Sequence, residues 1–263
     1  MSFENKRIWI TGASSGIGEQ LAYAFAARKA HLILSSRNVT ELEKVKANCQ
    51  GAASVMIYPI DLADHEGVAG VAKRVLERYG KIDILLHNGG LSQRALVKET
   101  KLSVDKYLMD VNYFGAVALT KAVLPSMITH QLGHIVVISS VMGYIGTQFR
   151  SAYAASKHAL HGYFDSLRNE VYDDNIRITI LCPGFVRTNV TLNALSGEGE
   201  KLGKMMKNTE KGMSPARFAQ KALRAIEKEK EEVLIGGKEV LTVYIKRLFP
   251  GFLSGFIRKR KEV

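Results

Sequence analysis

The amino-acid sequence predicts an α/β fold: a doubly wound parallel sheet with helices on both faces, forming three layers. Short apolar, β-branched runs alternate with longer helical patterns along the 263 residues, and this alternation favours parallel strands joined by right-handed crossovers. Several runs are apolar almost throughout, which is typical of strands covered on both faces. No repeat, low-complexity tract or linker interrupts the pattern, so residues 1–263 are expected to form a single domain.

The pattern places about seven strands and six main helices. The expected strands are 8–11, 32–35, 54–59, 82–87, 134–139, 177–182 and 233–235. The expected helices lie near 16–29, 39–49, 65–79, 103–130, 151–173 and 214–229. We expect the Rossmann strand order 3-2-1-4-5-6-7, with ligands bound beyond the carboxyl ends of the strands, where the order reverses.

Composition narrows the class of protein. A content of 46% hydrophobic and 24% charged residues is that of an ordinary globular protein. The first strand begins almost at residue 1, so we expect no signal peptide or leading membrane anchor. No apolar run reaches the roughly 18 residues that a spanning helix needs. Cys49 and Cys182 have neither metal-ligand nor disulfide spacing, so we expect no metal site and a cytoplasmic location.

The formal net charge of +12 raises the question of an anionic partner. Basic residues are mostly interspersed with acidic ones along the helices, which indicates a solvated face. Neither a nucleic-acid-binding motif nor a basic patch interleaved with aromatic residues is present, so we expect no nucleic-acid partner. The exception is a basic C-terminal end that contains Lys246, Arg247, Arg258, Lys259, Arg260 and Lys261.

A glycine-rich turn, Thr11-Gly-Ala-Ser-Ser-Gly-Ile-Gly18, joins the first strand to the first helix. Glycine allows a tight turn and brings backbone N–H groups close to a pyrophosphate, while the helix N-terminus favours negative charge. The alternative is a turn that merely connects the two elements. The strand–turn–helix context favours a dinucleotide site with contacts from Gly12, Ser14, Ser15, Gly16, Ile17 and Gly18.

The end of the second strand predicts which nicotinamide cofactor binds. NAD sites place a carboxylate here for the ribose 2′-hydroxyl, whereas this chain has Ser36 and Arg37. Arg37 can pair with a 2′-phosphate through charge-assisted hydrogen bonds, and Ser36 leaves room for it. The alternative is a solvated surface arginine. We expect NADP(H).

The ends of the third and fourth strands supply further candidate contacts to the cofactor. Asp61 and Leu62 end the third strand, where the Asp61 carboxylate can accept the adenine amino group or cap the following helix. Asn88 and Gly89 end the fourth strand, where glycine allows close approach of the backbone to the cofactor or forms a structural turn.

Tyr153 and Lys157 are the candidate proton-transfer pair. Their i, i+4 spacing puts phenol and ammonium on one face of a helix. A free tyrosine, with a pKa near 10, is a poor acid–base group at neutral pH, and a nearby ammonium lowers that pKa. Ser140 ends the fifth strand, where its hydroxyl can hold a substrate oxygen beside Tyr153.

Together these motifs, with Asn112 and Pro183–Gly184, resemble the short-chain dehydrogenase/reductases from about residue 5 to about residue 240. The resemblance implies a Ser140–Tyr153–Lys157 triad with Asn112 as a fourth member that supports a water-linked proton relay. It also implies that Lys157 binds the nicotinamide ribose, that Tyr153, Pro183, Gly184, Val186 and Thr188 contact the cofactor, and that the protein is a homodimer or homotetramer.

Within that family, the short sequence motifs Asn88–Arg94 and Ala155–Leu160 resemble those of the dehydrogenase/reductase member 7 and 11-beta-hydroxysteroid dehydrogenase-like group. Those relatives act on lipophilic carbonyls such as steroids and retinoids. The usual Asn-Asn-Ala-Gly is His87-Asn-Gly-Gly90 here. His87 is either a buried strand-end residue or a catalytic one.

Two C-terminal segments complete the prediction. Residues 189–214 contain Gly197, Gly199, Gly203 and Gly212 and are expected to form a substrate lid, with methionines 205, 206 and 213 as a pliable wall. Residues 239–263 carry apolar residues at helical spacing flanked by cations. This segment either lies on an anionic membrane or packs against the body of the protein or a sister subunit.

The sequence thus predicts an oxidoreductase that transfers hydride between NADP(H) and a small-molecule carbonyl or secondary alcohol, reducing a lipophilic ketone or aldehyde. The alternative is a catalytically silent NADP(H)-binding regulator on the same fold.

Overall fold

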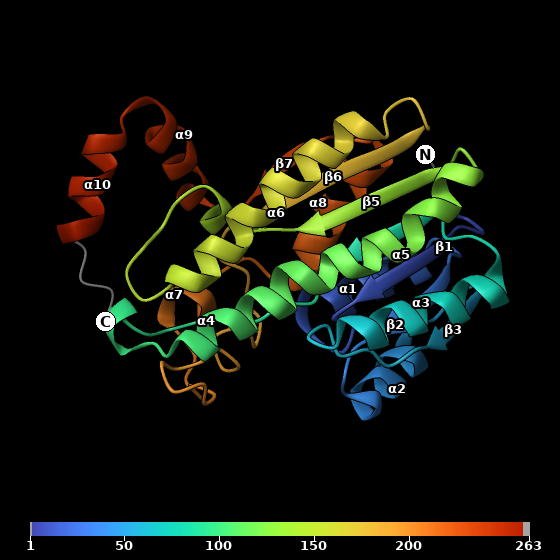
Figure 1. The fold of residues 1–263 in the computed structure, drawn as a ribbon, viewed down its shortest axis with the longest axis horizontal. Coiled ribbons are helices and arrows are strands. Elements are labelled where there is room, and N and C mark those ends of the chain that lie inside the picture. The colour runs from blue at the N-terminus through green and yellow to red at the C-terminus, as the bar shows by residue number, and fades with distance from the viewer. Residues whose placement is uncertain (1, 260–263) are drawn as a thin grey trace.

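The computed structural model describes residues 2–259 and confirms the doubly wound parallel sheet (Figure 1). Seven parallel strands lie in the order β3-β2-β1-β4-β5-β6-β7. The strands are β1 (Arg7–Thr11), β2 (His31–Ser35), β3 (Ser54–Ile57), β4 (Ile84–His87), β5 (Gly133–Ile138), β6 (Ile176–Pro183) and β7 (Glu232–Ile235).

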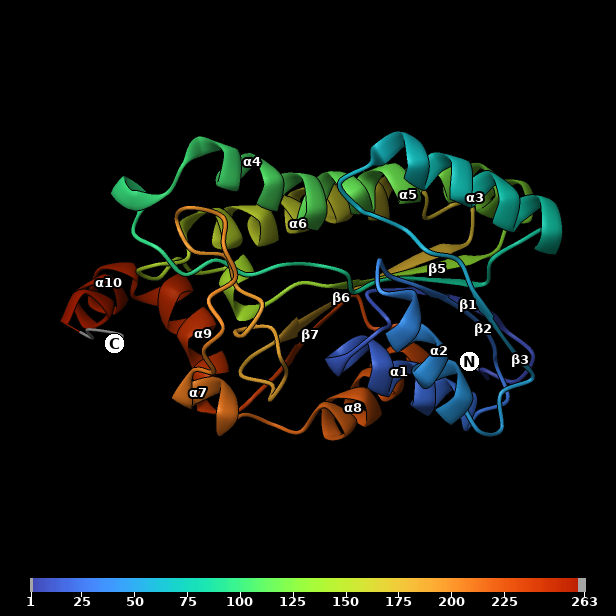
Figure 2. The ribbon, with the colours of Figure 1, turned by 90° about the horizontal axis from the view of Figure 1, so that it is seen from below.

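Helices cover both faces of the sheet. Figure 2 shows α3 (His65–Tyr79), α5 (Gly115–Thr129) and α6 (Ser151–Glu170) on one face, and α1 (Gly16–Ala26), α2 (Val39–Asn48) and α8 (Pro215–Glu227) on the other. Each face has its own apolar core, so the sheet is buried on both sides. Trp9 and Ile10, adjacent on β1, belong to opposite cores, as the alternation of side chains along a strand requires.

The expected helix 103–130 is interrupted. It consists of α4 (Leu102–Met109), a π-helical turn η2 (Asp110–Phe114) and α5. This segment, Leu102–Thr129, is the one stretch of residues 2–259 long and apolar enough to cross a membrane by length and composition. Core helices pass the same test, and Leu119, Val123 and Met127 of α5 are buried in the core between the helices and the sheet.

The remaining elements lie beyond the carboxyl ends of the strands or connect to them. They are the 3₁₀ turns η1 (Val97–Glu99), η3 (Val141–Gly143) and η4 (Lys238–Val240), and the helices α7 (Lys207–Glu210), α9 (Leu241–Leu248) and α10 (Pro250–Lys259). In Figures 1 and 2, α9 and α10 form a separate corner of the molecule, away from the central strands.

Close backbone packing at the strand ends leaves no room for side chains at certain glycines. A Cβ on Gly115, the first residue of α5, would lie 2.4 Å from the carbonyl oxygen of Leu62. Backbone cannot move aside as the tip of a flexible side chain can, so α5 contacts the loop after β3 directly.

We expect Gly115→Ala to lower the free energy of unfolding by about 1–3 kcal/mol, because the added methyl overpacks this contact. Alanine normally stabilises a helix, and Gly70→Ala in α3, where a Cβ would meet only the tip of Arg74 at 3.9 Å, should raise the same quantity by about 0.5–1 kcal/mol. Urea denaturation of both variants gives the comparison. Equal stabilisation by the two substitutions would contradict the close contact.

Candidate functional site

One cavity of about 650 Å³ lies beyond the carboxyl ends of the strands and brings most of the predicted residues together. Those that line it are Gly12, Ser14, Ser15, Gly16, Ile17, Ser36, Arg37, Asp61, Leu62, Asn88, Gly89, Ser140, Tyr153, Lys157, Pro183, Gly184, Val186 and Thr188. The two other predicted residues, Gly18 and Asn112, hold the backbone around the cavity rather than lining it.

The glycine turn and the end of β4 are hydrogen-bonded to each other. The Asn88 side-chain amide donates to the carbonyls of Thr11 (3.2 Å) and Gly12 (2.9 Å). The Thr11 hydroxyl accepts from the backbone N–H groups of Asn88 and Gly89, both at 3.1 Å. Asn88 therefore fixes the position of the turn in addition to lining the cavity.

The geometry of the turn fits a dinucleotide pyrophosphate. Gly12 (φ +63°) and Gly16 (φ +62°) have left-handed backbone conformations, which glycine adopts without strain. A Cβ on Gly16 would lie 3.1 Å from the methyl of Thr188, so the bare backbone of the turn faces Thr188 directly. Ser15, the N-cap of α1, makes no side-chain capping bond. The N-terminus of the helix lies at the cavity wall, as in phosphate sites, and its Gly16 N–H donates to the Glu19 carboxylate at 3.2 Å.

At the far end of the cavity, Arg37 extends from the end of β2 and donates a hydrogen bond to the Tyr107 hydroxyl of α4 at 2.8 Å. The guanidinium therefore lies at the cavity edge. Glu41, which the sequence interpretation missed, also lines this end, and its carboxylate is paired with Lys44 at 2.7 Å.

Asp61 does not cap α3, so that alternative was wrong. Its carboxylate accepts from the N–H of Ala63 at 3.0 Å, while Asp64, three residues later, is the N-cap and accepts from Gly67. Because the chain turns once more before the helix begins, Asp61 stays at the cavity wall.

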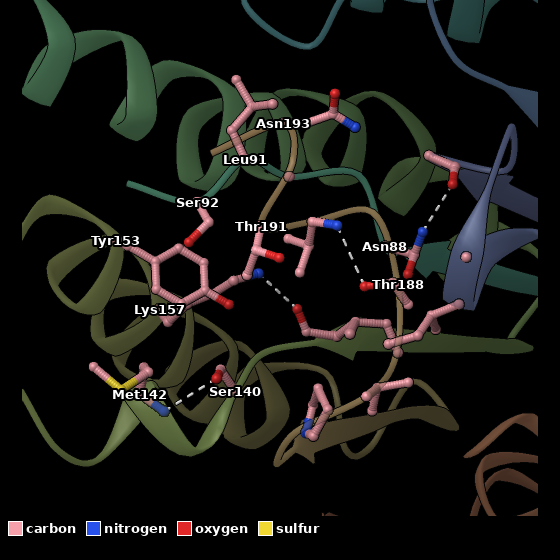
Figure 3. Close-up of a pocket in the computed structure, with 18 of the residues that line it drawn as sticks. Asn88, Leu91, Ser92, Ser140, Met142, Tyr153, Lys157, Thr188, Thr191 and Asn193 are labelled. Carbon is pink, nitrogen blue, oxygen red and sulfur yellow. Dashed lines mark hydrogen bonds between the residues drawn. The ribbon is translucent and has the colours of Figure 1, made fainter. Parts of the chain in front are cut away.

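Ser140, Tyr153 and Lys157 face one part of the cavity (Figure 3). Ser140 follows β5, and its hydroxyl oxygen accepts from the N–H of Met142 at 3.1 Å. Tyr153 and Lys157 lie in the first two turns of α6. The Lys157 ammonium lies 5.9 Å from the centre of the Tyr153 ring and donates to the Ile138 carbonyl at 2.8 Å.

Burial controls the protonation of both groups of the pair. It raises the pKa of Tyr153 above the usual 10, and the Ser140 hydroxyl, hydrogen-bonded to Tyr153, and the Arg150 charge partly oppose this rise. Burial lowers the pKa of Lys157 to about 8. In this geometry Ser140 and Arg150, rather than Lys157, are the groups that lower the pKa of Tyr153, and the Lys157 ammonium is engaged with the Ile138 carbonyl.

Asn112, in the π-helical turn η2, connects two walls of the site. Its side-chain oxygen accepts from the N–H of Leu91 at 2.7 Å, and its amide donates to the Leu91 carbonyl and the Ser156 hydroxyl, both at 2.9 Å. The π turn interrupts the long helix where this side chain is needed, a frequent role of such turns. The water-linked relay implied by the resemblance remains a prediction.

His87 is a core residue. Its ring contacts the Thr120 hydroxyl of α5 at 2.8 Å, and complete burial lowers its pKa to about 3. The imidazole is therefore neutral and faces the helix layer.

The segment 189–214 borders the cavity as expected, through Asn189, Val190, Thr191, Asn193, Lys201 and Thr209. Its predicted methionine wall is wrong, because none of methionines 205, 206 and 213 lines the cavity. Met213 is held by backbone hydrogen bonds to Phe185 and Arg187, both at 2.9 Å, and packs on the core. Met142, from the turn after β5, lines the wall instead.

Sequence reasoning also missed the contribution of the C-terminal helices to the cavity. Leu253 is buried against Val141, Met142 and Ile145, and Leu253, Phe256 and Ile257 line the cavity. Packing of this segment against the body is thus confirmed for its inner face. The helical spacing was visible in the sequence, but no local signal shows where the helix docks. Arg260 and Lys261 lie outside the described residues.

Comparison with known proteins agrees with this geometry. The family model for short chain dehydrogenases matches residues 6–199. The dehydrogenase/reductase SDR family member 7B of Xenopus laevis is 45% identical over 261 residues, which cover 96% of this chain and 81% of that protein. A short-chain dehydrogenase structure from Streptomyces avermitilis superposes with a TM-score of 0.81 at 30% identity, covering 97% of both chains.

A solved alcohol dehydrogenase from Thermococcus sibiricus, complexed with 5-hydroxy-NADP, superposes with a TM-score of 0.76 at 29% identity. The alignment covers 90% of this chain and 98% of that one. The chain belongs to the short-chain dehydrogenase/reductase family of oxidoreductases.

Proposed function

We propose that this protein reduces a lipophilic ketone or aldehyde to the alcohol with NADPH. The observation that carries the proposal is the convergence of Ser140, Tyr153 and Lys157 on a cavity that is continuous with the glycine turn. A substrate carbonyl beside Tyr153 lies in the same cavity as a cofactor held by that turn.

The polar groups of the site suit a substrate carbonyl oxygen. The Ser140 oxygen accepts from Met142, and the Ser140 hydrogen, which interacts with Tyr153 in this structure, can be donated to that oxygen when a substrate binds. The Tyr153 hydroxyl is the second donor. When bound, the reduced nicotinamide supplies the hydride to the carbonyl carbon.

Tyr153 transfers its proton to the oxygen as negative charge develops there. With its pKa raised by burial, Tyr153 is a neutral phenol at neutral pH, which is the form that a proton donor requires. Ser140 and Arg150, which oppose the rise in the pKa of Tyr153, stabilise the resulting phenolate in a site where burial strengthens electrostatic interactions.

The substrate wall favours an apolar molecule. Around Ser140 and Tyr153 the cavity wall includes the apolar side chains of Leu91, Val141, Met142, Ile145, Leu253 and Ile257, and polar side chains, among them Ser92, Gln148 and Arg150, line the cavity as well. Apolar walls combined with polar groups that fix orientation are typical of sites for small organic ligands.

Arg37 supports NADP(H) over NAD(H). It is an exposed cation at the cavity end that follows β2, and the nearest acidic side chain in sequence, Glu41, is already paired with Lys44. A 2′-phosphate would therefore meet a guanidinium that is positioned by Tyr107.

We expect Tyr153→Phe to reduce kcat for carbonyl reduction at least about 100-fold, because it removes the proton donor without removing the ring. NADPH oxidation at 340 nm against a panel of ketones, aldehydes, steroids and quinones measures this, and fluorescence titration should show unchanged NADPH affinity. Tight NADPH binding by the wild type without turnover of any carbonyl would favour the silent regulator instead.

We expect Arg37→Ala to raise KM for NADPH about 10- to 100-fold, because the variant loses one group that forms charge-assisted hydrogen bonds with the 2′-phosphate. KM for NADH, which has no 2′-phosphate, should change little. Lys46→Ala is the matched control, since it removes a nearby exposed cation that neither lines the cavity nor pairs with Glu41. A wild type that prefers NADH would contradict the role of Arg37.

Lys157 should titrate far below the other lysines, near pH 8 in the cofactor-free protein, against about 10.4 for exposed lysines. Its charge is therefore retained below that pH and lost as the pH rises through it. NMR of the protein with isotope-labelled lysine side chains measures the midpoint, and Lys157→Arg identifies the resonance. A midpoint shared with the surface lysines would show that the ammonium is not desolvated.

A further inference from the structure

The outer faces of α9 and α10 expose an unusual concentration of large apolar side chains. Of the 13 large hydrophobic residues that are exposed within residues 2–259, six lie on this short segment. They are Leu241, Tyr244, Leu248, Phe249, Phe252 and Phe256, which are 50–69% exposed, and together they are called the tail surface below. Such a concentration marks an interaction site rather than the scattered exposure found on any protein.

The two helices are amphipathic, so the exposure is not simply the result of a frayed end. On α9, Leu241, Tyr244 and Leu248 follow the i, i+3, i+7 spacing of one helical face, whereas Val243 and Ile245 pack inward. On α10, Phe252 and Phe256 are exposed, while Leu253 is 2% exposed and packed in the core. The inner face holds the segment to the body, and the outer face is exposed.

Exposed cations surround the tail surface. Lys246 and Arg247 are exposed at the end of α9, and Arg258 and Lys259 at the end of α10. The one acidic residue between 238 and 259, Glu239, faces the body, where it accepts from the N–H groups of Phe185 and Gly237, both at 2.9 Å. Exposed positive charge therefore lies at the end of each of the two helices that carry the tail surface.

The tail surface also adjoins the cavity. Phe256 is 50% exposed and lines the cavity, together with its helix neighbours Leu253 and Ile257. A partner that covers the outer face of α10 is therefore separated from the cavity only by the side chains of this helix.

We propose that the tail surface docks on an anionic lipid membrane and places the mouth of the cavity at the bilayer. Apolar side chains surrounded by lysine and arginine are the pattern of interfacial helices, whose aromatic and aliphatic groups enter the headgroup region while cations meet anionic lipids. A second copy of the same face would bring like charges together, which opposes a symmetric dimer through it. Uptake of substrate from the bilayer rests on the proposed reductase function; the docking itself does not.

The test is co-sedimentation of the full-length protein with vesicles of phosphatidylcholine and phosphatidylserine, and with vesicles of phosphatidylcholine alone, in the absence of substrate and cofactor. We expect the wild type to bind the anionic vesicles more tightly. The double variant L248E/F252E should bind them at least about tenfold more weakly. The double variant K246Q/R247Q should lose about fivefold in affinity for each charge removed, on the anionic vesicles only.

Tyr172→Glu is the matched control, because Tyr172 is a 61% exposed aromatic residue beyond the carboxyl end of α6, away from the tail surface. It should bind like the wild type. All variants should retain activity toward a water-soluble carbonyl, since none of the substituted residues lines the cavity. L248E/F252E should be slower only toward a substrate dissolved in the vesicles.

Three results would overturn the docking proposal: no binding of the wild type to either vesicle, equal binding by L248E/F252E, or a wild-type oligomer that this variant dissociates while no vesicle binding occurs. The last outcome would assign the tail surface to a second copy of the chain. Vesicle binding by a protein that reduces no carbonyl would leave the docking intact and reject the proposed function alone.

Discussion

The whole site depends on how closely the backbones of β1 and β4 approach one another at their carboxyl ends. Thr11 and Asn88 connect the two strand ends through four hydrogen bonds that link side chains to backbone. A Cβ on Gly12 would lie 2.7 Å from the Cα of Gly89, so this approach tolerates no side chain. The strand order reverses between β1 and β4, and ligands of such sheets bind in the crevice at this point. The contact between the two strand ends therefore also forms part of the cavity wall.

The second constraint on the site is the desolvation of a charged group, the Lys157 ammonium. Lys157 is 5% exposed, and burying an ammonium costs free energy unless it is paired and hydrogen-bonded. One carbonyl, that of Ile138, compensates in part, and the lowered pKa shows that the compensation is incomplete. A group kept charged at such a cost, next to a buried phenol, is typical of a site organised for chemistry rather than for stability.

Much of the fold and site could be predicted from the sequence because the decisive signals are local. Alternation of apolar runs with helical periodicity predicted the sheet, and glycine spacing after β1 and the i, i+4 pair Tyr153 and Lys157 predicted the two ends of the cavity. What could not be predicted depends on contacts between distant segments. Asp61 and Asp64 are equivalent candidates for the N-cap of α3 until the start of that helix is known. The packing of α10 against η3 has no signal in the local sequence. The prediction of a methionine wall was wrong for the same reason, because backbone hydrogen bonds between distant segments, such as the one from Met213 to Phe185, place Met213 against the core.

The contribution of α10 to the cavity wall has a consequence for biosynthesis. The turn after β1 and the Ser140–Tyr153–Lys157 cluster lie within residues 11–157, so the reactive part of the site is translated well before α10. Leu253, Phe256 and Ile257 leave the ribosome only after these groups. A nascent chain that has not yet reached α10, or a chain truncated before it, therefore has its reactive groups without this part of the cavity wall.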